Sequence, residues 1–385
     1  MQFELSDRIK RLPPYLFAAI DEEKQKLKNK GIKLIDLSVG DPDIKAPQKV
    51  VKQLYKSAQV KENQKYGSAR SKEPLRTAIK QWFKKRFKVS LNQQNQILPL
   101  IGSKEGLVNL PLGFVNRGDY VLLPDPAYPG YQGAAILAGA KIHKMPLHEK
   151  NYFLPDLGKI PESILNKAKM MYLNYPNNPA TALAPEKFLK EVVSICRKYG
   201  IILVYDNAYS EVYFDRKPYS ILQIKGAEEV TIEFHSLSKT FCMTGFRIGW
   251  ACGSPQLING LSKVKTNIDS GIFGAVQDAG VVALQECAGF VKDLRDIISE
   301  RREVMLDILS QAGFNKLYSQ ATFYIWARLP EGFKSSIKFA KYLLEEKHIV
   351  ATPGLGFGRS GEGFIRFALT VDKNILRETG RLLKR

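Results

Sequence analysis

Short, mainly apolar runs alternate with longer amphipathic segments through the first part of the chain. The runs, which are typical of strands buried on both faces of a sheet, are Ile32–Leu37, Tyr120–Leu123, Met170–Leu173 and Ile201–Tyr205. Segments with apolar residues at helical spacing lie at Leu75–Phe87, Gly106–Phe114 and Pro185–Tyr199. The last begins with proline and stops before Gly200, as helices commonly do. This alternation predicts an α/β fold with a largely parallel sheet.

The pattern changes after about Val276. A long helix is predicted at Gln277–Leu309, followed by an alternating strand at Ala321–Leu329, a helix at Phe333–Lys347 and a strand at Gly363–Leu369. These elements indicate a smaller α+β domain, and we expect Arg8–Lys30 to pack with it. Because 385 residues exceed what one core usually organises, two domains are expected. We place the large domain at residues 46–280 and the small one at residues 1–45 and 281–385.

The composition, 44% apolar and 25% charged, is typical of a soluble globular protein. No segment approaches the roughly 20 apolar residues that a membrane helix needs, and the first residues lack the apolar core of a signal peptide. The cysteines show no ligand spacing, and the four histidines are scattered. We therefore expect a cytoplasmic protein with reduced cysteines and no metal site. The cysteines are Cys196, Cys242, Cys252 and Cys287.

The formal net charge of +20 raises the question of nucleic-acid binding. The densest basic stretches, Lys24–Lys33 and Lys80–Lys88, interleave lysines with apolar residues at helical spacing, which is typical of a solvated helix face. The chain has no room for an added DNA-binding domain. We expect no nucleic-acid partner, and a basic surface that draws in anionic cofactors and substrates.

The segment His235–Trp250 contains Ser236, Lys239 and Arg247. A Ser-x-x-Lys tetrad occurs in serine acyl-enzymes, where Ser236 would be the nucleophile and Lys239 its base, but the S-D-N and K-T-G motifs of those enzymes are absent. The spacing also resembles the lysine segment of class I/II aminotransferases, which have the pyridoxal 5′-phosphate (PLP) transferase fold type I. That resemblance implies that Lys239 bonds PLP covalently, while Ser236 and Arg247 hold its phosphate.

Four further segments resemble the family's cofactor site, in the family's order. Ile201–Tyr209 implies that Asp206 pairs with the protonated pyridine nitrogen and that Tyr209 bonds the phenolate oxygen. Asn174–Pro179 implies that Asn178 hydrogen-bonds the same phenolate oxygen, although the family's Thr-Gly continuation is Ala180-Thr181 here. Asp125–Tyr131 places Tyr128 against the pyridine ring and leaves Tyr131 open between site and core. Ile101–Gly106 implies a phosphate turn made by the Ser103 hydroxyl and the N–H groups of Ser103 and Lys104.

Two more segments carry the resemblance to the subunit interface and the substrate. Lys65–Arg76 implies that Tyr66 reaches the phosphate of a neighbouring subunit, hence a homodimer, although Ser71 replaces the family's glycine. Gly361–Leu369 implies that Arg366 binds the substrate's α-carboxylate, with the backbone of Gly40 and the side chain of Asn178 beside it.

These resemblances imply an α/β enzyme with a mostly parallel seven-stranded sheet, a smaller α+β domain and PLP as cofactor. It would move an amino group between an L-amino acid and a 2-oxo acid, 2-oxoglutarate and glutamate being one pair, with Lys239 as the base. Arg11–Asp21, Asn267–Phe273 and Ala321–Ala327 are similar to the LL-diaminopimelate aminotransferase branch, which serves lysine biosynthesis and places Tyr15 at the pocket mouth. Aspartate, alanine and aromatic amino acids stay open as substrates, and a β-lyase as a more distant reaction.

Overall fold

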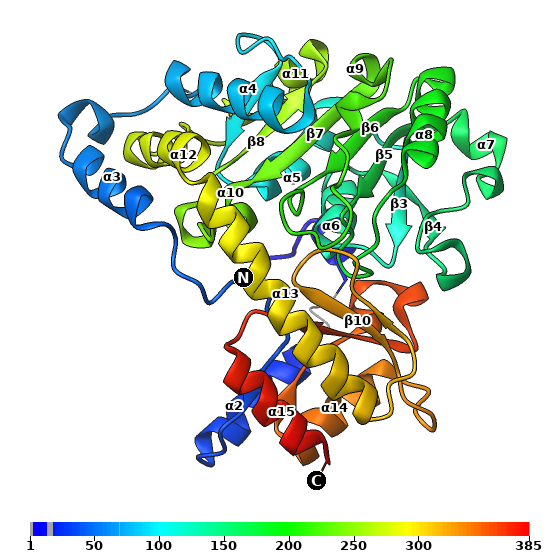
Figure 1. Ribbon diagram of the computed structural model, residues 1–385. Helices are drawn as coiled ribbons and strands as arrows, with labels where there is room; N and C mark the ends of the chain where they lie inside the picture. The colour runs from blue at the N-terminus through cyan, green and yellow to red at the C-terminus, as the bar shows by residue number, and fades with distance from the viewer. Residues whose placement is uncertain (1–2, 14–17, 69, 385) are drawn as a thin grey trace.

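The computed structural model describes residues 3–13, 18–68 and 70–384, and its larger part is built on a seven-stranded sheet (Figure 1). The strand order is β2-β8-β7-β6-β5-β3-β4, and β8 runs antiparallel to the other six strands, which are parallel to one another. The bounds are β2 (Ile97–Leu100), β3 (Tyr120–Asp125), β4 (Lys141–Pro146), β5 (Ala168–Asn174), β6 (Ile202–Asp206), β7 (Thr231–Ser236) and β8 (Gly249–Gly253). The predicted α/β fold with a mostly parallel seven-stranded sheet is confirmed.

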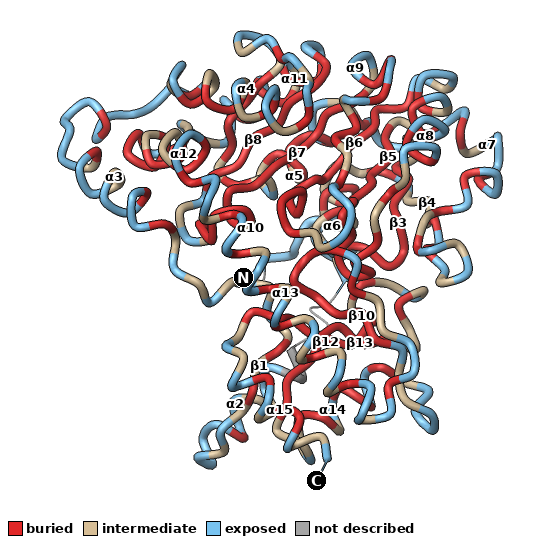
Figure 2. The backbone as a smooth tube through the Cα atoms, viewed as in Figure 1, coloured by how far each residue is buried: buried red, intermediate tan, exposed pale blue. Residues whose placement is uncertain are grey.

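Helices cover both faces of this sheet. On β5, Met170 and Tyr172 join the core beneath one helix layer, while Met171 and Leu173 join the core beneath the other. The first layer is α5 (Ser103–Phe114), α6 (Pro129–Leu137) and α11 (Pro255–Lys265), and the second includes α4 (Glu73–Phe87), α8 (Glu186–Tyr199) and α12 (Gly274–Glu286). Apart from the edge strand β4, the strands of this sheet are buried along nearly their whole length, and the outer helix faces are exposed (Figure 2). Both faces being covered explains the continuous apolar runs.

A second, smaller part lies at the carboxyl-terminal edge of that sheet (Figure 1). An antiparallel sheet in the order β12-β13-β10-β9 is joined by a parallel pair, β1 and β11. The strands are β1 (Ile35–Asp36), β9 (Leu317–Tyr318), β10 (Tyr324–Arg328), β11 (Ile349–Val350), β12 (Thr352–Pro353) and β13 (Phe364–Ala368). The helices are α2 (Ala18–Asn29), α13 (Ala288–Gln311), α14 (Ser336–Lys347) and α15 (Lys373–Lys384). In α2, Leu27 packs against Leu344 and Val350.

The remaining elements are short apart from α3, which packs against α12. They are α1 (Asp7–Lys10), α3 (Gln48–Ala58), α7 (Glu162–Leu165), α9 (Ala227–Val230), α10 (Leu237–Thr240) and seven 3₁₀ turns, η1 (Lys61–Gln64), η2 (Glu149–Asn151), η3 (Leu157–Lys159), η4 (Ile221–Gln223), η5 (Thr244–Phe246), η6 (Gly354–Phe357) and η7 (Arg359–Gly361). Among the described residues no helix is long and apolar enough to span a bilayer.

Two sequence predictions are wrong in detail. The single helix expected at Gln277–Leu309 is two helices, α12 and α13, which break at Cys287, where φ is −108° and ψ is 27°. The break lets α12 pack against α3 and α4 while α13 runs on to α15. The strand expected at Ile32–Leu37 is reduced to Ile35–Asp36, because its partner strand β11 is itself only two residues long.

The parallel strands end at one edge of the large sheet. There β3 ends in Asp125, β5 in Asn174, β6 in Asp206 and β7 in Ser236. Polar side chains at the carboxyl ends of adjacent parallel strands meet at a common crevice. This edge faces the small sheet and holds the site.

Candidate active site

A cavity of about 540 Å³ lies between this strand edge and strands β10 and β13. Its walls bring together residues from segments that are far apart in the chain. Among the residues predicted for the site, the lining contains Gly40, Ser103, Lys104, Tyr128, Asn178, Asp206, Tyr209, Ser236, Lys239, Arg247 and Arg366. A cavity of this size suits a small ligand with several polar groups.

Lys239 lies in α10, the single helical turn that follows β7. Its Nζ donates a hydrogen bond to the Gly40 carbonyl oxygen at 2.7 Å. The pKa of Lys239 is lowered from 10.5 to about 8, mainly by burial; Asp41 opposes the decrease, and nearby Arg366 and Arg247 contribute to it. The side chain is therefore available as a neutral amine far more readily than an exposed lysine is.

Asp206 ends β6 and is buried. Its Oδ2 accepts a hydrogen bond from the Tyr131 hydroxyl at 2.6 Å, and its Oδ1 accepts one from the Ala208 N–H at 3.2 Å. Burial raises the pKa of Asp206, and these two hydrogen bonds oppose that rise. Asn174 holds the backbone here, because its Nδ2 donates to the Asp206 carbonyl oxygen at 2.9 Å. The carboxylate is thus fixed in place before any ligand binds.

Arg366 comes from β13 and is buried against the opposite wall. It donates through Nη1 to Asn178 Oδ1 at 2.7 Å and through Nη2 to the Ser38 carbonyl oxygen at 2.7 Å. The guanidinium lies 4.1 Å from the centre of the Tyr324 ring. Its buried Nε has no hydrogen-bond partner among the described residues. The group is oriented and retains a donor for an anionic ligand.

A turn at the start of α5 meets Arg247 on another wall. Gly102 has φ 77°, and a Cβ added there would lie 2.6 Å from Arg247 Nη2, so glycine allows this close approach without backbone strain or displacement of the guanidinium. Arg247 is held by its Nη1, which donates to the Thr244 carbonyl oxygen at 2.7 Å. With Ser103 at the helix start and Ser236 in the same lining, this corner offers N–H, hydroxyl and guanidinium donors to a phosphate.

Three tyrosines complete the walls. The hydroxyls of Tyr209 and Tyr324 share a hydrogen bond at 3.1 Å, and burial raises the pKa of Tyr209. Tyr324 also packs against Gly40, where an added Cβ would overlap its hydroxyl. Tyr128 precedes α6 and makes an edge contact with Tyr131, with ring centres 5.6 Å apart. These rings fix the shape of the cavity.

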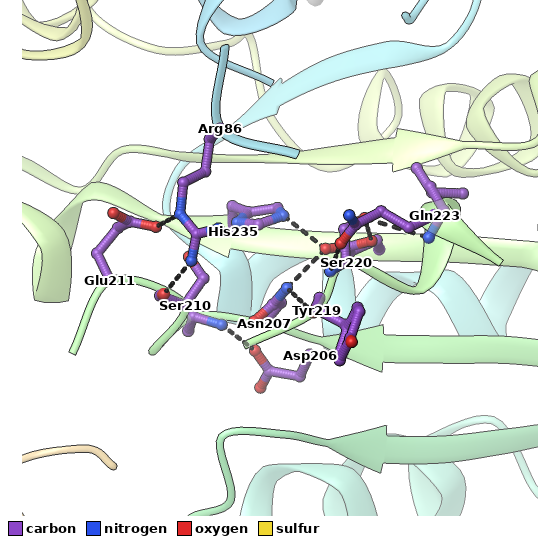
Figure 3. Close-up of polar contacts among 12 residues, drawn as sticks. Arg86, Asp206, Asn207, Ser210, Glu211, Tyr219, Ser220, Gln223 and His235 are labelled. Carbon is purple, nitrogen blue, oxygen red and sulfur yellow. Dashed lines mark hydrogen bonds and ion pairs between the residues drawn. The ribbon is translucent and has the colours of Figure 1, made fainter. Parts of the chain in front are cut away.

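Behind Asp206, a buried polar network joins β6 and β7 (Figure 3). Glu233 is fully buried and accepts hydrogen bonds from His235 Nε2 at 2.8 Å, from Asn207 Nδ2 at 2.8 Å and from Ser220 Oγ at 2.6 Å. The His235 ring stacks on Trp250, with centres 4.9 Å apart. These bonds hold the strand ends that carry Asp206 and Ser236.

The donors, the buried carboxylate and the lysine together form a site for a phosphorylated, ring-containing carbonyl compound. The aminotransferase class I and II family matches residues 32–379 of the chain. The chain belongs to this family. The alternative of a serine acyl-enzyme is therefore wrong.

The proteins similar to this chain match it over almost its whole length. A relative from Aquifex aeolicus, named LL-diaminopimelate aminotransferase, is 49% identical over 99% of both chains. Among solved structures, substrate-bound BacF from Bacillus subtilis is 33% identical with a TM-score of 0.95, covering 100% of this chain and 98% of its own. A probable N-succinyldiaminopimelate aminotransferase from Thermus thermophilus is 35% identical with a TM-score of 0.90, covering 96% and 99%. The expected fold type I is confirmed.

The enzyme is a PLP-dependent transaminase, as the sequence predicted. The residues present fit the cofactor. The Gly102 turn and Arg247 supply donors for a phosphate dianion, the buried Asp206 suits a protonated ring nitrogen, and Lys239 suits a carbonyl carbon. No group of three or more His, Cys, Asp or Glu suited to a metal ion occurs in the described part of the chain.

One predicted residue that the structure describes, Tyr66, does not line the cavity and is 94% exposed. Tyr15 lies outside the described residues. Conversely, the structure adds Asn174 and Tyr324 to the site. It also places Tyr131 in the site, where its hydroxyl donates a hydrogen bond to the Asp206 carboxylate. The sequence signal for Tyr131 was present, because the residue lies three positions after Tyr128, but it did not distinguish site from core.

Both departures from the family's pattern occur at positive φ. Ser71 and Thr181 both stand where the family has glycine. Their φ angles are 62° and 61°. The backbone keeps the glycine-type conformation in spite of the side chains. Around Thr181 the turn is held because Asn177 accepts hydrogen bonds from Ala180 N–H at 2.8 Å and, through its carbonyl, from Thr181 N–H at 2.9 Å.

Proposed function

We propose that this aminotransferase transfers an amino group between LL-diaminopimelate and 2-oxoglutarate, and so serves lysine biosynthesis. The observation that carries the proposal is the 49% identity, over 99% of both chains, to the Aquifex aeolicus LL-diaminopimelate aminotransferase. The cavity supports it, because acidic Asp41 and basic Lys24, the latter paired with Asp36, both line it in addition to Lys239. A substrate whose far end carries both an ammonium and a carboxylate group needs both signs of charge.

The groups in the cavity support the following catalytic roles. PLP, when bound, supplies an electron sink that stabilises negative charge at the substrate's Cα. We assign Lys239 as the group that bonds the cofactor and, as a free amine, carries the proton from Cα. The Asp206 carboxylate would stabilise the protonated, positively charged form of the cofactor's ring nitrogen. Arg366, held by Asn178, binds the α-carboxylate beside Gly40 and thereby orients the Cα–H bond.

The binding roles complete the proposal. The N–H groups of Ser103 and Lys104, with Ser236 and Arg247, would hold the phosphate. Tyr128 would lie against the ring. Asn178 and Tyr209 would donate to its phenolate oxygen. For Tyr15 we retain the role at the pocket mouth that the resemblance implies.

We further propose a homodimer in which Tyr66 completes the neighbouring site. Its ring is 94% exposed, and Gly67 packs against the carbonyl of Ile272, next to Phe273, which is 47% exposed. Ile268, on the same loop, is 54% exposed. Exposed apolar side chains on two adjoining loops are typical of a surface that a second subunit covers.

The domain division at residues 46–280 against 1–45 and 281–385, and a cytoplasmic location, remain parts of the same proposal. The four free cysteines, all buried, agree with a reducing compartment.

The deciding experiment is a panel of amino donors assayed against 2-oxoglutarate. It contains LL-diaminopimelate, N-succinyl-diaminopimelate, aspartate, alanine and phenylalanine. The highest kcat/KM is expected for LL-diaminopimelate, and a higher value for any other donor would reject the substrate assignment. Lys239→Ala is expected to lose both turnover and the visible absorbance of the lysine-bound cofactor. Retention of either would reject the role of Lys239.

A further inference from the structure

A second cavity, of about 550 Å³, lies outside the active site, between α4, α13 and the segment that follows β6. It is as large as the catalytic cavity. Among the residues that the structure describes, four basic side chains line it, together with one acidic side chain, Glu211. The basic residues are Lys85, Arg86, Lys217 and Arg295.

The two arginines share the single carboxylate. Arg86 Nε lies 2.7 Å from Glu211 Oε1, whereas Arg295 Nη1 lies 3.8 Å from Oε2. The side chain of Glu211 is 9% exposed, that of Arg86 15% and that of Arg295 24% (Figure 3 shows Arg86 and Glu211). One buried carboxylate cannot neutralise two partly buried guanidiniums, so the cavity keeps an excess of positive charge.

An aromatic ring holds both guanidiniums in place. The centre of the Tyr213 ring lies 4.7 Å from Arg295 Cζ and 5.6 Å from Arg86 Cζ. Arg86 Nη2 also donates to the Ser210 carbonyl oxygen at 3.2 Å. Because these contacts fix the guanidiniums, little side-chain entropy is lost when an anion binds them.

Another part of the lining is apolar. Trp82, Phe241 and Leu284 line the same cavity. A free inorganic ion would leave this surface unused, whereas an anion on an apolar body would cover it. We propose that this cavity binds a small organic anion, one that carries a carboxylate or phosphate group on an aromatic or aliphatic body, and that its occupancy acts on the catalytic site.

Two residues that line this cavity are close in sequence to residues of the catalytic site. Glu211 follows Tyr209 by two residues, and Phe241 follows Lys239 by two. Arg86 holds the carbonyl of Ser210, the residue next to Tyr209. A ligand that draws Arg86 or Arg295 away from Glu211 therefore changes the packing of the segments that carry Tyr209 and Lys239.

The binding test uses the fluorescent aromatic sulfonate 8-anilinonaphthalene-1-sulfonate (ANS) as the probe and the PLP-loaded enzyme. The variant is Arg295→Gln/Lys85→Gln, which removes two charges from the cavity and leaves the Arg86–Glu211 pair intact. The matched control, Lys292→Gln/Lys84→Gln, removes two charges from α13 and α4 at exposed side chains that do not line the cavity.

We expect the first variant to bind ANS at least roughly tenfold more weakly than wild type, since a hydrogen bond to a charged group contributes that much. The control variant is expected to match wild type, and glutamate at saturating concentration is expected to leave ANS bound. Equal ANS affinity in all three proteins, or displacement of ANS by glutamate, would overturn the site. Binding of inorganic phosphate as tight as that of ANS would overturn the role of the apolar wall.

The coupling has its own readout. Saturating ANS is expected to change kcat or the donor KM of wild type and of the control at least twofold, and to leave the Arg295→Gln/Lys85→Gln variant unaffected at the same concentration. A wild-type rate that does not respond while the cavity is filled would overturn the coupling.

Discussion

The lowered pKa of Lys239 predicts how the stability of the cofactor-free enzyme depends on pH. The pKa of about 8 lies below the ordinary 10.5 because burial disfavours the charged form. Between these two values the unfolded chain binds more protons than the folded chain, so the free energy of unfolding rises with pH. The full difference corresponds to about 3.4 kcal/mol. Between about pH 6.5 and about pH 9.5 the gain that is attributable to this lysine is about 2 kcal/mol.

The perturbation that isolates this effect is Lys239→Met, which keeps the length of the side chain and removes the titrating amine. Urea unfolding of both cofactor-free proteins is measured from about pH 6.5 to about pH 9.5. The variant also loses the hydrogen bond to Gly40, but that loss is a constant offset. The advantage of the variant over wild type should shrink by about 2 kcal/mol as the pH rises. Lys84→Met, at an exposed lysine of α4, should show no such trend. A difference between wild type and Lys239→Met that is independent of pH would refute the reasoning.

Three other outcomes test the site and the turns around it. Tyr131→Phe removes the donor to the buried Asp206 carboxylate and should cost about 1.5–3 kcal/mol in urea unfolding, whereas Tyr175→Phe, which removes a bond to the neutral carbonyl of Phe153, should cost about 1 kcal/mol; equal losses would show that the charge of Asp206 contributes nothing. Ser71→Gly removes a buried hydroxyl without a partner from a residue at φ 62° and should raise the free energy of unfolding by about 1 kcal/mol, while Ser90→Gly, at an exposed serine whose φ is not positive, should lower it; destabilisation by Ser71→Gly would contradict the strain argument. Arg366→Lys cannot keep both the Asn178 and the Ser38 contact, so the donor KM should rise roughly tenfold to a hundredfold with a smaller change in kcat; an unchanged KM would remove Arg366 from carboxylate binding.

The sequence predicts the large sheet well because burial on both faces leaves a direct trace. In β5 neither Met170 nor Met171 can be polar, since each faces a separate helix layer. The break at Cys287 leaves no such trace. The apolar spacing continues across it, and only the packing of α12 against α3 shows that the chain must turn. Helix breaks that are set by long-range packing cannot be found from local periodicity.

The site divides in the same way. Lys239, Asp206 and Arg366 carry motifs, and the structure brings them into one cavity. Tyr131 has no motif of its own. Its hydroxyl reaches Asp206 only because α6 begins at Pro129 and directs that side chain under the strand ends. The orientation of a helix relative to a sheet is a tertiary property, so the sequence could not decide whether Tyr131 contacts the site or the core.

The two central groups of the site share one cause for their perturbation. Burial lowers the pKa of Lys239 and raises the pKa of Asp206, so in the cofactor-free protein it disfavours both charges. Hydrogen bonds from neighbouring segments offset part of this unfavourable free energy. Lys239 donates to the Gly40 carbonyl oxygen, and Asp206 accepts from the Tyr131 hydroxyl. A ligand that brings a complementary charge to Asp206 and a carbonyl to Lys239 removes part of that cost. The folded state is then stabilised beyond the ligand's surface contacts alone. Cofactor affinity and protein stability are therefore coupled through these two residues, which is why the pH trend of Lys239 must be measured in the cofactor-free enzyme.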